Sequence, residues 1–195
     1  MQQKKDAPLR SDAQRNRERI LEVALAELTR CADVPLSVIA KKAGVGQGTF
    51  YRNFPSREAL VLELYRHEMR QVADAAHELL KTHEPVRALR EWMDHLARFA
   101  MTKAGLADAI RQATSAPGSP AKPGHTPVTS AAELLLRTNE EAGTIRPGVT
   151  GDDFFLAIAG LWQLDPHGDW QSRAGRLLDL VMDGLRAGAS GRRES

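Results

Sequence analysis

A chain of 195 residues is long enough for one domain, or for a small domain joined to a larger one, and its 42% apolar and 27% charged residues allow a buried core. The net charge of +2 hides a basic N-terminal part, since residues 1–55 hold ten Lys and Arg against six Asp and Glu. The lack of a signal-like apolar run in residues 1–19 and of any stretch of 18 apolar residues argues against a secreted or membrane-spanning chain, and we expect a cytoplasmic protein.

The chain begins with a basic arm and an amphipathic helix. Residues 1–11 offer nothing to bury, so we predict a disordered arm. From Asp12 to about Arg30, apolar residues recur at helical spacing and predict a helix with one apolar face. The single cysteine, Cys31, cannot form an internal disulfide, which indicates a reducing compartment, and we expect it to be a small apolar filler.

Two short helices follow. Pro35 begins the first and Gly44 ends it. The second runs from about Gln47 to Asn53 and ends at Phe54-Pro55, because the residue before a proline is disfavoured in the α region. Two helices that meet at a steep angle need small residues where they touch and a positive φ between them. The residues that we assign to this shape are Ile39, Ala40, Ala43, Gly44, Val45, Phe50 and Phe54.

The rest of the chain predicts six more helices, which makes nine in all and an all-α fold. Their ranges are 56–80, 85–102, 104–114, 126–142, 152–164 and 170–187. Residues 115–125 hold three prolines and two glycines and predict a mobile loop. Thr150 and Asp153 resemble a capping box in its acidic variant. We expect residues 189–195 to be a flexible tail.

The outward face of the helix at 47–53 carries hydrogen-bonding groups and no acid. Gln and Asn can pair with adenine edges and Arg with guanine, while Thr and Tyr hydroxyls suit phosphate oxygens. Gly46 and Gly48 allow close approach of the backbone, and Arg57 lies near enough in sequence to contact a flanking phosphate. These residues predict a DNA-reading surface; the alternative is an ordinary exposed face of a helical hairpin. The residues concerned are Gly46, Gln47, Gly48, Thr49, Tyr51, Arg52, Asn53 and Arg57.

The run IAKKAGVGQGTFYRNFPSREAL, residues 39–60, resembles the N-terminal domain of the TetR family of bacterial transcriptional regulators. That family's pattern is roughly I-A-x-x-A-G-V-S-x-G-T-L-Y-x-H-F, followed by a Lys or Arg early in the next helix, and the resemblance covers about residues 15–65. Three positions depart from the pattern: Gly46 replaces a serine, Asn53 a histidine, and Pro35 a frequent Ser or Thr. The resemblance implies DNA contacts at Gln47, Thr49, Tyr51, Asn53 and Arg57, with Arg52 as a base reader and Ser37 contributed by the preceding helix.

The resemblance also implies a helix-turn-helix domain at 12–55 and a larger effector-binding and dimerisation domain at 56–188. One short helix reads little sequence, so two copies on a palindromic operator are expected. The helices at 152–164 and 170–187 are candidates for the dimer contact or, alternatively, ordinary core. A pocket for an apolar effector is expected among Tyr65, Met69, Trp92, Leu96, Phe99, Met101 and Ile110, which are equally typical of plain core.

Other functional classes find less support. The segment GVGQG at 44–48 is not a phosphate-binding loop, because no strand precedes it and no Lys-Ser/Thr follows. Asp165, His167 and Asp169 are the nearest approach to a metal cluster, on a turn that favours Asp for backbone reasons. We therefore expect no catalytic residues, metal or cofactor. We predict a DNA-binding regulator that acts as a repressor and is released from its operator by a small, largely apolar molecule. The alternatives are a helical adaptor protein and, less favoured, an enzyme.

Overall fold

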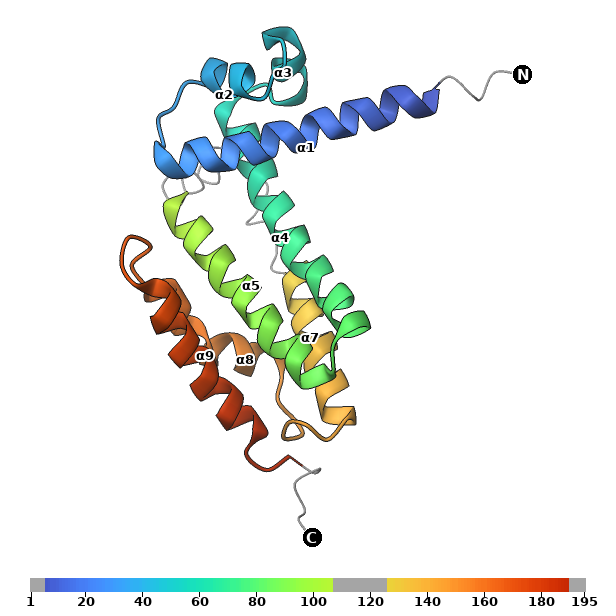
Figure 1. Ribbon diagram of the computed structural model, residues 1–195, viewed down its shortest axis with the longest axis vertical. Helices are drawn as coiled ribbons and strands as arrows, with labels where there is room; N and C mark the ends of the chain where they lie inside the picture. Colours follow the sequence, from blue (N-terminus) through green and yellow to red (C-terminus); the bar gives the residue numbers. More distant parts are fainter. Residues whose placement is uncertain (1–5, 107–125, 190–195) are drawn as a thin grey trace, which may run out of the picture. The chain divides into compact units, whose positions relative to one another are not determined.

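The structure is a computed structural model that describes residues 6–106 and 126–189, and it confirms the all-α prediction (Figure 1). Within these ranges the chain forms eight α-helices and one short 3₁₀ helix. The elements are α1 (Asp6–Arg30), α2 (Leu36–Lys42), α3 (Gln47–Asn53), α4 (Arg57–Thr82), α5 (Pro85–Gly105), α7 (Thr126–Glu141), α8 (Gly151–Ala157), η1 (Ala159–Gln163) and α9 (Trp170–Arg186).

The chain divides into two compact units, and the boundary lies inside α4. Among the described residues, the first unit holds 6–67 with 105–106, and the second holds 68–104 with 126–189. The boundary predicted from sequence lies at residue 55, before α4, whereas the two contact units divide within this helix. Leu60, Val61 and Leu64 explain the difference, because these residues of α4 are buried in the core of the first unit.

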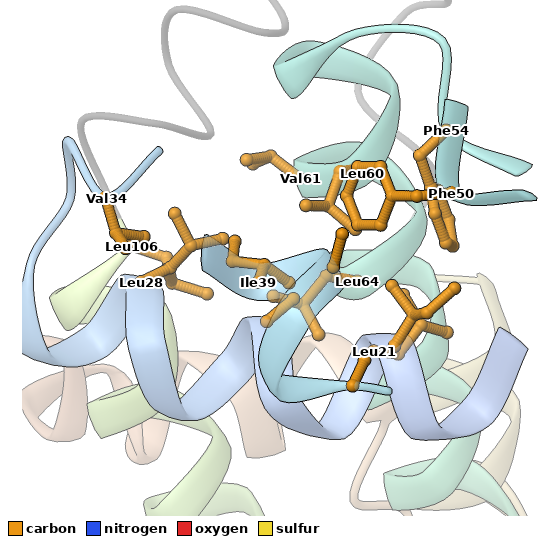
Figure 2. Close-up of a cluster of buried hydrophobic side chains, with 14 residues drawn as sticks. Leu21, Leu28, Val34, Ile39, Phe50, Phe54, Leu60, Val61, Leu64 and Leu106 are labelled. Carbon is orange, nitrogen blue, oxygen red and sulfur yellow. The ribbon is translucent and has the colours of Figure 1, made fainter. Parts of the chain in front are cut away.

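A single hydrophobic cluster holds the first unit together. Figure 2 shows Phe50 and Phe54 beside Leu60, and the rings of Phe50 and Phe54 lie 5.9 Å apart between centroids. Leu28 and Ile39 extend the cluster toward α1 and α2. Burying one large apolar side chain stabilises the folded state by about 1.5–3 kcal/mol. Because the buried residues come from α1, α2, α3 and α4, this burial holds the four helices together around one core.

Two predictions at the N-terminal end are wrong. Residues 6–11 belong to α1 rather than to a disordered arm. Pro8 is tolerated there because N–H groups in the first turn have no partner within the helix, and extending an existing helix is easier than starting one. Cys31 is exposed rather than a buried filler, because it follows the last residue of α1 and the core positions around it are taken by Leu28 and Val34.

The second unit is built around a buried tryptophan. Trp92 of α5 is fully buried, and its Nε1 donates to the carbonyl oxygen of Val72 in α4 at 2.8 Å. The ring of Phe154 in α8 lies 6.1 Å from the Trp92 ring. Asn139 of α7 is also fully buried, and its amide donates to the carbonyl oxygen of Pro85 at 2.9 Å. These contacts join α4, α5, α7 and α8 in one core.

The remaining helices differ from prediction in two places. Residues 152–164 are not one helix, because α8 ends at Ala157 and η1 follows. Gly160 of η1 lies close to α9, since an added Cβ there would lie 3.2 Å from Cδ2 of Leu177. Residues 104 and 105 continue α5, as no Gly or Pro stands before them to end it, so no new helix begins at 104. The remainder of the predicted helix 104–114, the loop at 115–125 and the tail from 190 lie outside the described residues.

Candidate nucleic-acid interface

The turn between α2 and α3 fixes how the two helices meet. Gly44 has φ +66°, in the left-handed region that only glycine adopts freely. The N–H of Val45 donates to the carbonyl oxygen of Ala40 at 3.1 Å, and the N–H of Gly44 to that of Lys41 at 3.1 Å. Together these bonds make a Schellman motif, which ends a helix and redirects the chain. The sequence prediction of a positive φ at Gly44 is therefore confirmed.

Helix α3 has one buried side and one exposed side. Phe50 is fully buried, while the neighbouring Tyr51 is 45% exposed and meets the Phe50 ring edge-on. Gln47 and Arg52 are exposed, and Thr49 and Asn53 are half-buried. Since α3 spans Gln47–Asn53 as predicted, the polar residues lie on the outward side that the sequence pattern assigned to them.

Two polar side chains of α3 bond along their own helix. Arg52 donates from Nε to the carbonyl oxygen of Gly48 at 3.2 Å and from Nη2 to Oγ1 of Thr49 at 3.1 Å. Asn53 donates from Nδ2 to the carbonyl oxygen of Thr49 at 2.9 Å. The bonds of Arg52 are exposed to solvent, so a base edge can replace them at little cost.

Gly46 and Gly48 have no packing role within the chain. A Cβ added to either glycine would meet nothing within 4 Å. Gly46 has φ −65° and ψ 146°, an extended conformation that any residue adopts. Neither close packing nor backbone conformation therefore explains why Gly46 is a glycine.

The helix pair carries positive charge without acids of its own. Residues 36–57 include Lys41, Lys42, Arg52 and Arg57 and contain no Asp or Glu. Glu27 of α1 compensates part of this charge, because its carboxylate accepts from Lys42 Nζ at 2.6 Å and from Arg30 Nη2 at 2.8 Å. Those two hydrogen bonds, the one from Lys42 first, lower the pKa of Glu27. Lys41 and Arg52 remain exposed.

Arg57 is the first residue of α4, as expected, and its side chain bonds within the chain. Its Nη1 donates to the carbonyl oxygen of Ala32 at 2.8 Å, and its Nη2 donates to that of Val34. Both carbonyls belong to the connection between α1 and α2. The sequence could not reveal this role, because backbone carbonyls far along the chain leave no residue pattern.

The residues predicted to contact DNA all lie in the first unit. Ser37 is exposed on α2, and the predicted residues on and beside α3 form one continuous stretch. The structure thus brings Ser37, Gly46, Gln47, Gly48, Thr49, Tyr51, Arg52 and Asn53 onto the paired helices α2 and α3 and the turn that joins them, with Arg57 engaged at the start of α4.

The residues predicted to line an effector pocket are mostly core. Tyr65, Met69, Trp92, Leu96, Phe99 and Met101 are between 0% and 8% exposed, and Ile110 lies outside the described residues. Phe99 also lines a hollow of about 360 Å³ between α4 and α5 of the second unit. Sequence reasoning missed the polar residues of this hollow, which recur at helical spacing on each helix. They are Glu68, Gln71, His95, Arg98 and Thr102.

Burial shapes the ionisable groups of this hollow. It raises the pKa of Glu68, because desolvation disfavours the charged carboxylate. It also lowers the pKa of His95, and the positive charge of Arg98 lowers it further. The hollow therefore combines an apolar floor with groups that favour their neutral forms.

The described residues hold neither a metal-ligand cluster nor a helix that could cross a membrane. None of them form a group of three or more His, Cys, Asp or Glu that could hold a metal ion. Asp165 instead accepts from the backbone N–H of His167 at 2.9 Å, and Asp169 caps α9 by accepting from the N–H of Ser172. None of the helices in the described ranges has the length and apolarity to cross a bilayer.

Family models match both parts of the chain. A model described as bacterial regulatory proteins, tetR family, matches residues 20–64. A second, described as transcriptional regulator SbtR-like, C-terminal domain, matches residues 84–187. A search of the curated proteins finds no match.

Solved structures agree with the family models. The TetR transcriptional regulator SCO0520 from Streptomyces coelicolor is 39% identical, with a TM-score of 0.79, over 87% of this chain and 98% of its own. A TetR regulatory protein from Mycobacterium vanbaalenii is 34% identical, with a TM-score of 0.74, over 92% of this chain and 99% of its own. The reduced form of NemR from E. coli shares the fold, at 18% identity and a TM-score of 0.60, over 88% of this chain and 96% of its own.

Proposed function

The chain belongs to the TetR family of bacterial DNA-binding transcriptional regulators, and we propose on that basis that it is a ligand-responsive repressor whose α3 reads operator DNA. Members of this family are regulators and not enzymes. The observation that carries the proposal is the outward face of α3, which is polar, free of acids and held in place by the buried Phe50 on its other side. We place the regulator in the cytoplasm, where bacterial operators lie.

The proposed contacts follow from the chemistry of each side chain. Gln47 and Arg52 are exposed and can hydrogen-bond to base edges in the major groove. The hydroxyls of Ser37, Thr49 and Tyr51 suit phosphate oxygens. Gly46 and Gly48 leave room for the DNA backbone. Asn53 bonds to the carbonyl oxygen of Thr49, and we include it among the DNA contacts because it lies on the same face of α3.

The test is selection of duplexes from a random pool by the wild-type protein, followed by gel shift at two salt concentrations. We expect retention of a selected sequence that weakens steeply as salt rises, because Lys and Arg release counterions from phosphate. Arg52→Ala should change the selected bases, whereas Tyr51→Phe should weaken all sequences nearly equally. Lys81→Gln, which removes an exposed charge on α4 in the second unit, serves as the control. Absence of any salt-sensitive selection would favour the alternative, a helical adaptor protein.

A homodimer is the proposed form on the operator. Leu156 of α8 and Leu180 of α9 are 75% and 70% exposed, and together they supply apolar surface of the kind that can mark a contact with another chain. The other sides of these helices are core, with Phe154 and Leu178 buried. Thus each helix has a partner inside the chain and an apolar face left for a second copy. A two-fold dimer would present two copies of α3 to a palindromic operator.

The second unit is the proposed effector-binding part. Its hollow between α4 and α5 has a volume near the lower limit for small-molecule pockets, about 300 Å³. Phe99 and Val72 supply apolar surface there, against which the apolar part of the proposed effector can pack. Effector binding would release DNA by favouring a state with lower operator affinity.

The effector proposal is tested with a panel of small aromatic and aliphatic compounds. A binding compound should raise the thermal midpoint of the wild-type protein and release the selected duplex. Phe99→Ala should weaken both effects while DNA binding without the compound stays unchanged. A compound that releases DNA equally well from wild type and Phe99→Ala would place the effector elsewhere.

A further inference from the structure

Arg57 stands at a helix position that does not favour a cation. It is the first residue of α4, where the helix dipole favours negative charge. Ser56 caps this helix, its Oγ accepting from the N–H of Ala59 at 3.1 Å, and Glu58 supplies the favourable charge. The start of α4 therefore gives no reason for a cation at this position, and the contacts of the Arg57 side chain give one.

The Arg57 guanidinium holds the connection between α1 and α2. Its two terminal nitrogens donate to two carbonyls two residues apart, those of Ala32 and Val34. The same connection is bent by a hydrogen bond from the N–H of Val34 to the carbonyl oxygen of Cys31 at 3.1 Å, and the Val34 side chain is buried. The planar fork of arginine suits such a paired acceptor, which a single ammonium group cannot reproduce.

The opposite end of α2 is also held by a charged group. Lys42, the last residue of α2, donates to Glu27 of α1 at 2.6 Å. Helix α2 is therefore held at both ends. The connection that precedes α2 bonds to Arg57 of α4, and its last residue, Lys42, bonds to Glu27 of α1. Because the Schellman turn joins α3 directly to α2, the direction of α3 depends on both ties.

We propose that Arg57 is a positioning residue for operator recognition, which orients α2 and α3 through the carbonyls of Ala32 and Val34 and does not bind a phosphate. A swing of the guanidinium to a phosphate would leave both carbonyls without their donors and free the connection that leads into α2. The inference rests on the proposed reading of DNA by α3.

The experiment compares two variants of the full-length protein, Arg57→Lys and Arg57→Gln. Each is measured on the duplex that the wild-type protein selects from a random pool and on unselected duplex, across a range of salt. Lys81→Gln is the charge control on the same helix. Thermal melts set a temperature at which every variant is folded, so that loss of binding is separated from loss of fold.

A positioning role predicts that both variants lose affinity for the selected duplex, by roughly ten-fold, as expected when a reading element is misplaced. Affinity for unselected duplex should stay within about two-fold, and the salt slope for Arg57→Lys should equal that of the wild type. A phosphate contact predicts the reverse. Arg57→Lys would then bind like the wild type, and Arg57→Gln would weaken both duplexes alike with a salt slope smaller by about one. That result, or unchanged binding by both variants, would overturn the proposal.

A second measurement keeps the test decisive if Arg57→Gln does not fold. Single phosphates of the selected duplex are replaced in turn by neutral methylphosphonates, and binding is measured with the wild type and Arg57→Met, which keeps a long side chain and removes its charge. The proposal expects the same pattern of losses for both proteins. A phosphate whose neutralisation weakens the wild type but not Arg57→Met would overturn it. If the wild type selects no sequence at all, the proposed function fails together with this inference, whereas the variant results bear on the inference alone.

Discussion

Gly44 and Gly46, on either side of Val45, provide a test of the turn between α2 and α3. The backbone conformation requires a glycine at position 44 but not at position 46. In Gly44→Ala the new Cβ would come no closer than 3.9 Å to another group, the Nη2 of Arg19, so there is no clash. The cost is then that of the left-handed backbone alone, about 1–2 kcal/mol for a residue with a Cβ. The smaller freedom of the unfolded alanine chain offsets about 0.4–1 kcal/mol of this.

We therefore expect Gly44→Ala to destabilise the first unit by about 1 kcal/mol, and Gly44→Asn by less, because asparagine tolerates the left-handed region. Gly46→Ala is the matched control. Its φ of −65° suits alanine and a Cβ there meets nothing within 4 Å, so its stability should be unchanged or slightly higher. The same substitution should nevertheless weaken DNA binding if Gly46 allows the backbone of DNA to approach.

The assay is urea unfolding of the three variants and the wild type, followed by near- and far-UV circular dichroism, with gel shift on the selected duplex. In a thermal melt of a unit of this size, 1 kcal/mol of destabilisation would lower the Tm by about 4–8 °C. Equal destabilisation by Gly44→Ala and Gly46→Ala would refute the reasoning, since it assigns strain to only one of the two positions. So would an unchanged midpoint for Gly44→Ala.

Three further predictions concern the dimer, the second unit and acid stability. Leu180→Ala should raise the dimer dissociation constant by at least ten-fold, because a two-fold dimer loses the side chain twice at about 1–2 kcal/mol each. Analytical ultracentrifugation measures this constant, with Gln171→Ala as the control. An unchanged dissociation constant for Leu180→Ala would contradict the prediction. Trp92→Phe should destabilise the second unit by about 1–3 kcal/mol, since the Val72 carbonyl loses its donor; an unchanged unfolding midpoint would contradict that role. The pKa of Glu27 is lowered in the fold, chiefly by Lys42, so its contribution is present above the unfolded pKa of about 4.3 and is lost as pH falls through the folded value. Glu27→Gln should therefore flatten the loss of stability below about pH 5 in acid melts, and an unchanged acid profile would speak against the tie to Lys42.

The turn between α2 and α3 and the end of α3 could be predicted from sequence because their causes are local. Gly44 before α3 and Pro55 after it lie within a few residues of the helix, and each acts through its own backbone preference. The bounds of α3 and the capping box of Thr150 with Asp153 were correct for this reason.

Features that depend on distant parts of the chain could not be predicted. The partners of Arg57 are backbone carbonyls, which every residue carries, so its role has no signature in the sequence. Apolar residues such as Trp92 and Leu96 have the same sequence pattern whether they line a cavity or fill a core, and both are buried here. Cys31 was misplaced because burial at the end of a helix depends on which neighbours cover it.

On the proposed reading of DNA by α3, the separation of this helix into a buried and an exposed side makes the operator preference open to redesign. Phe50 holds the helix from within, while Gln47 and Arg52 stand outside the core and bond to nothing that the fold requires. Libraries that vary the outward residues and leave Phe50 unchanged can therefore sample new DNA sequences at nearly constant stability. The same independence gives natural selection a route by which duplicated genes acquire separate binding sites without first losing a folded product.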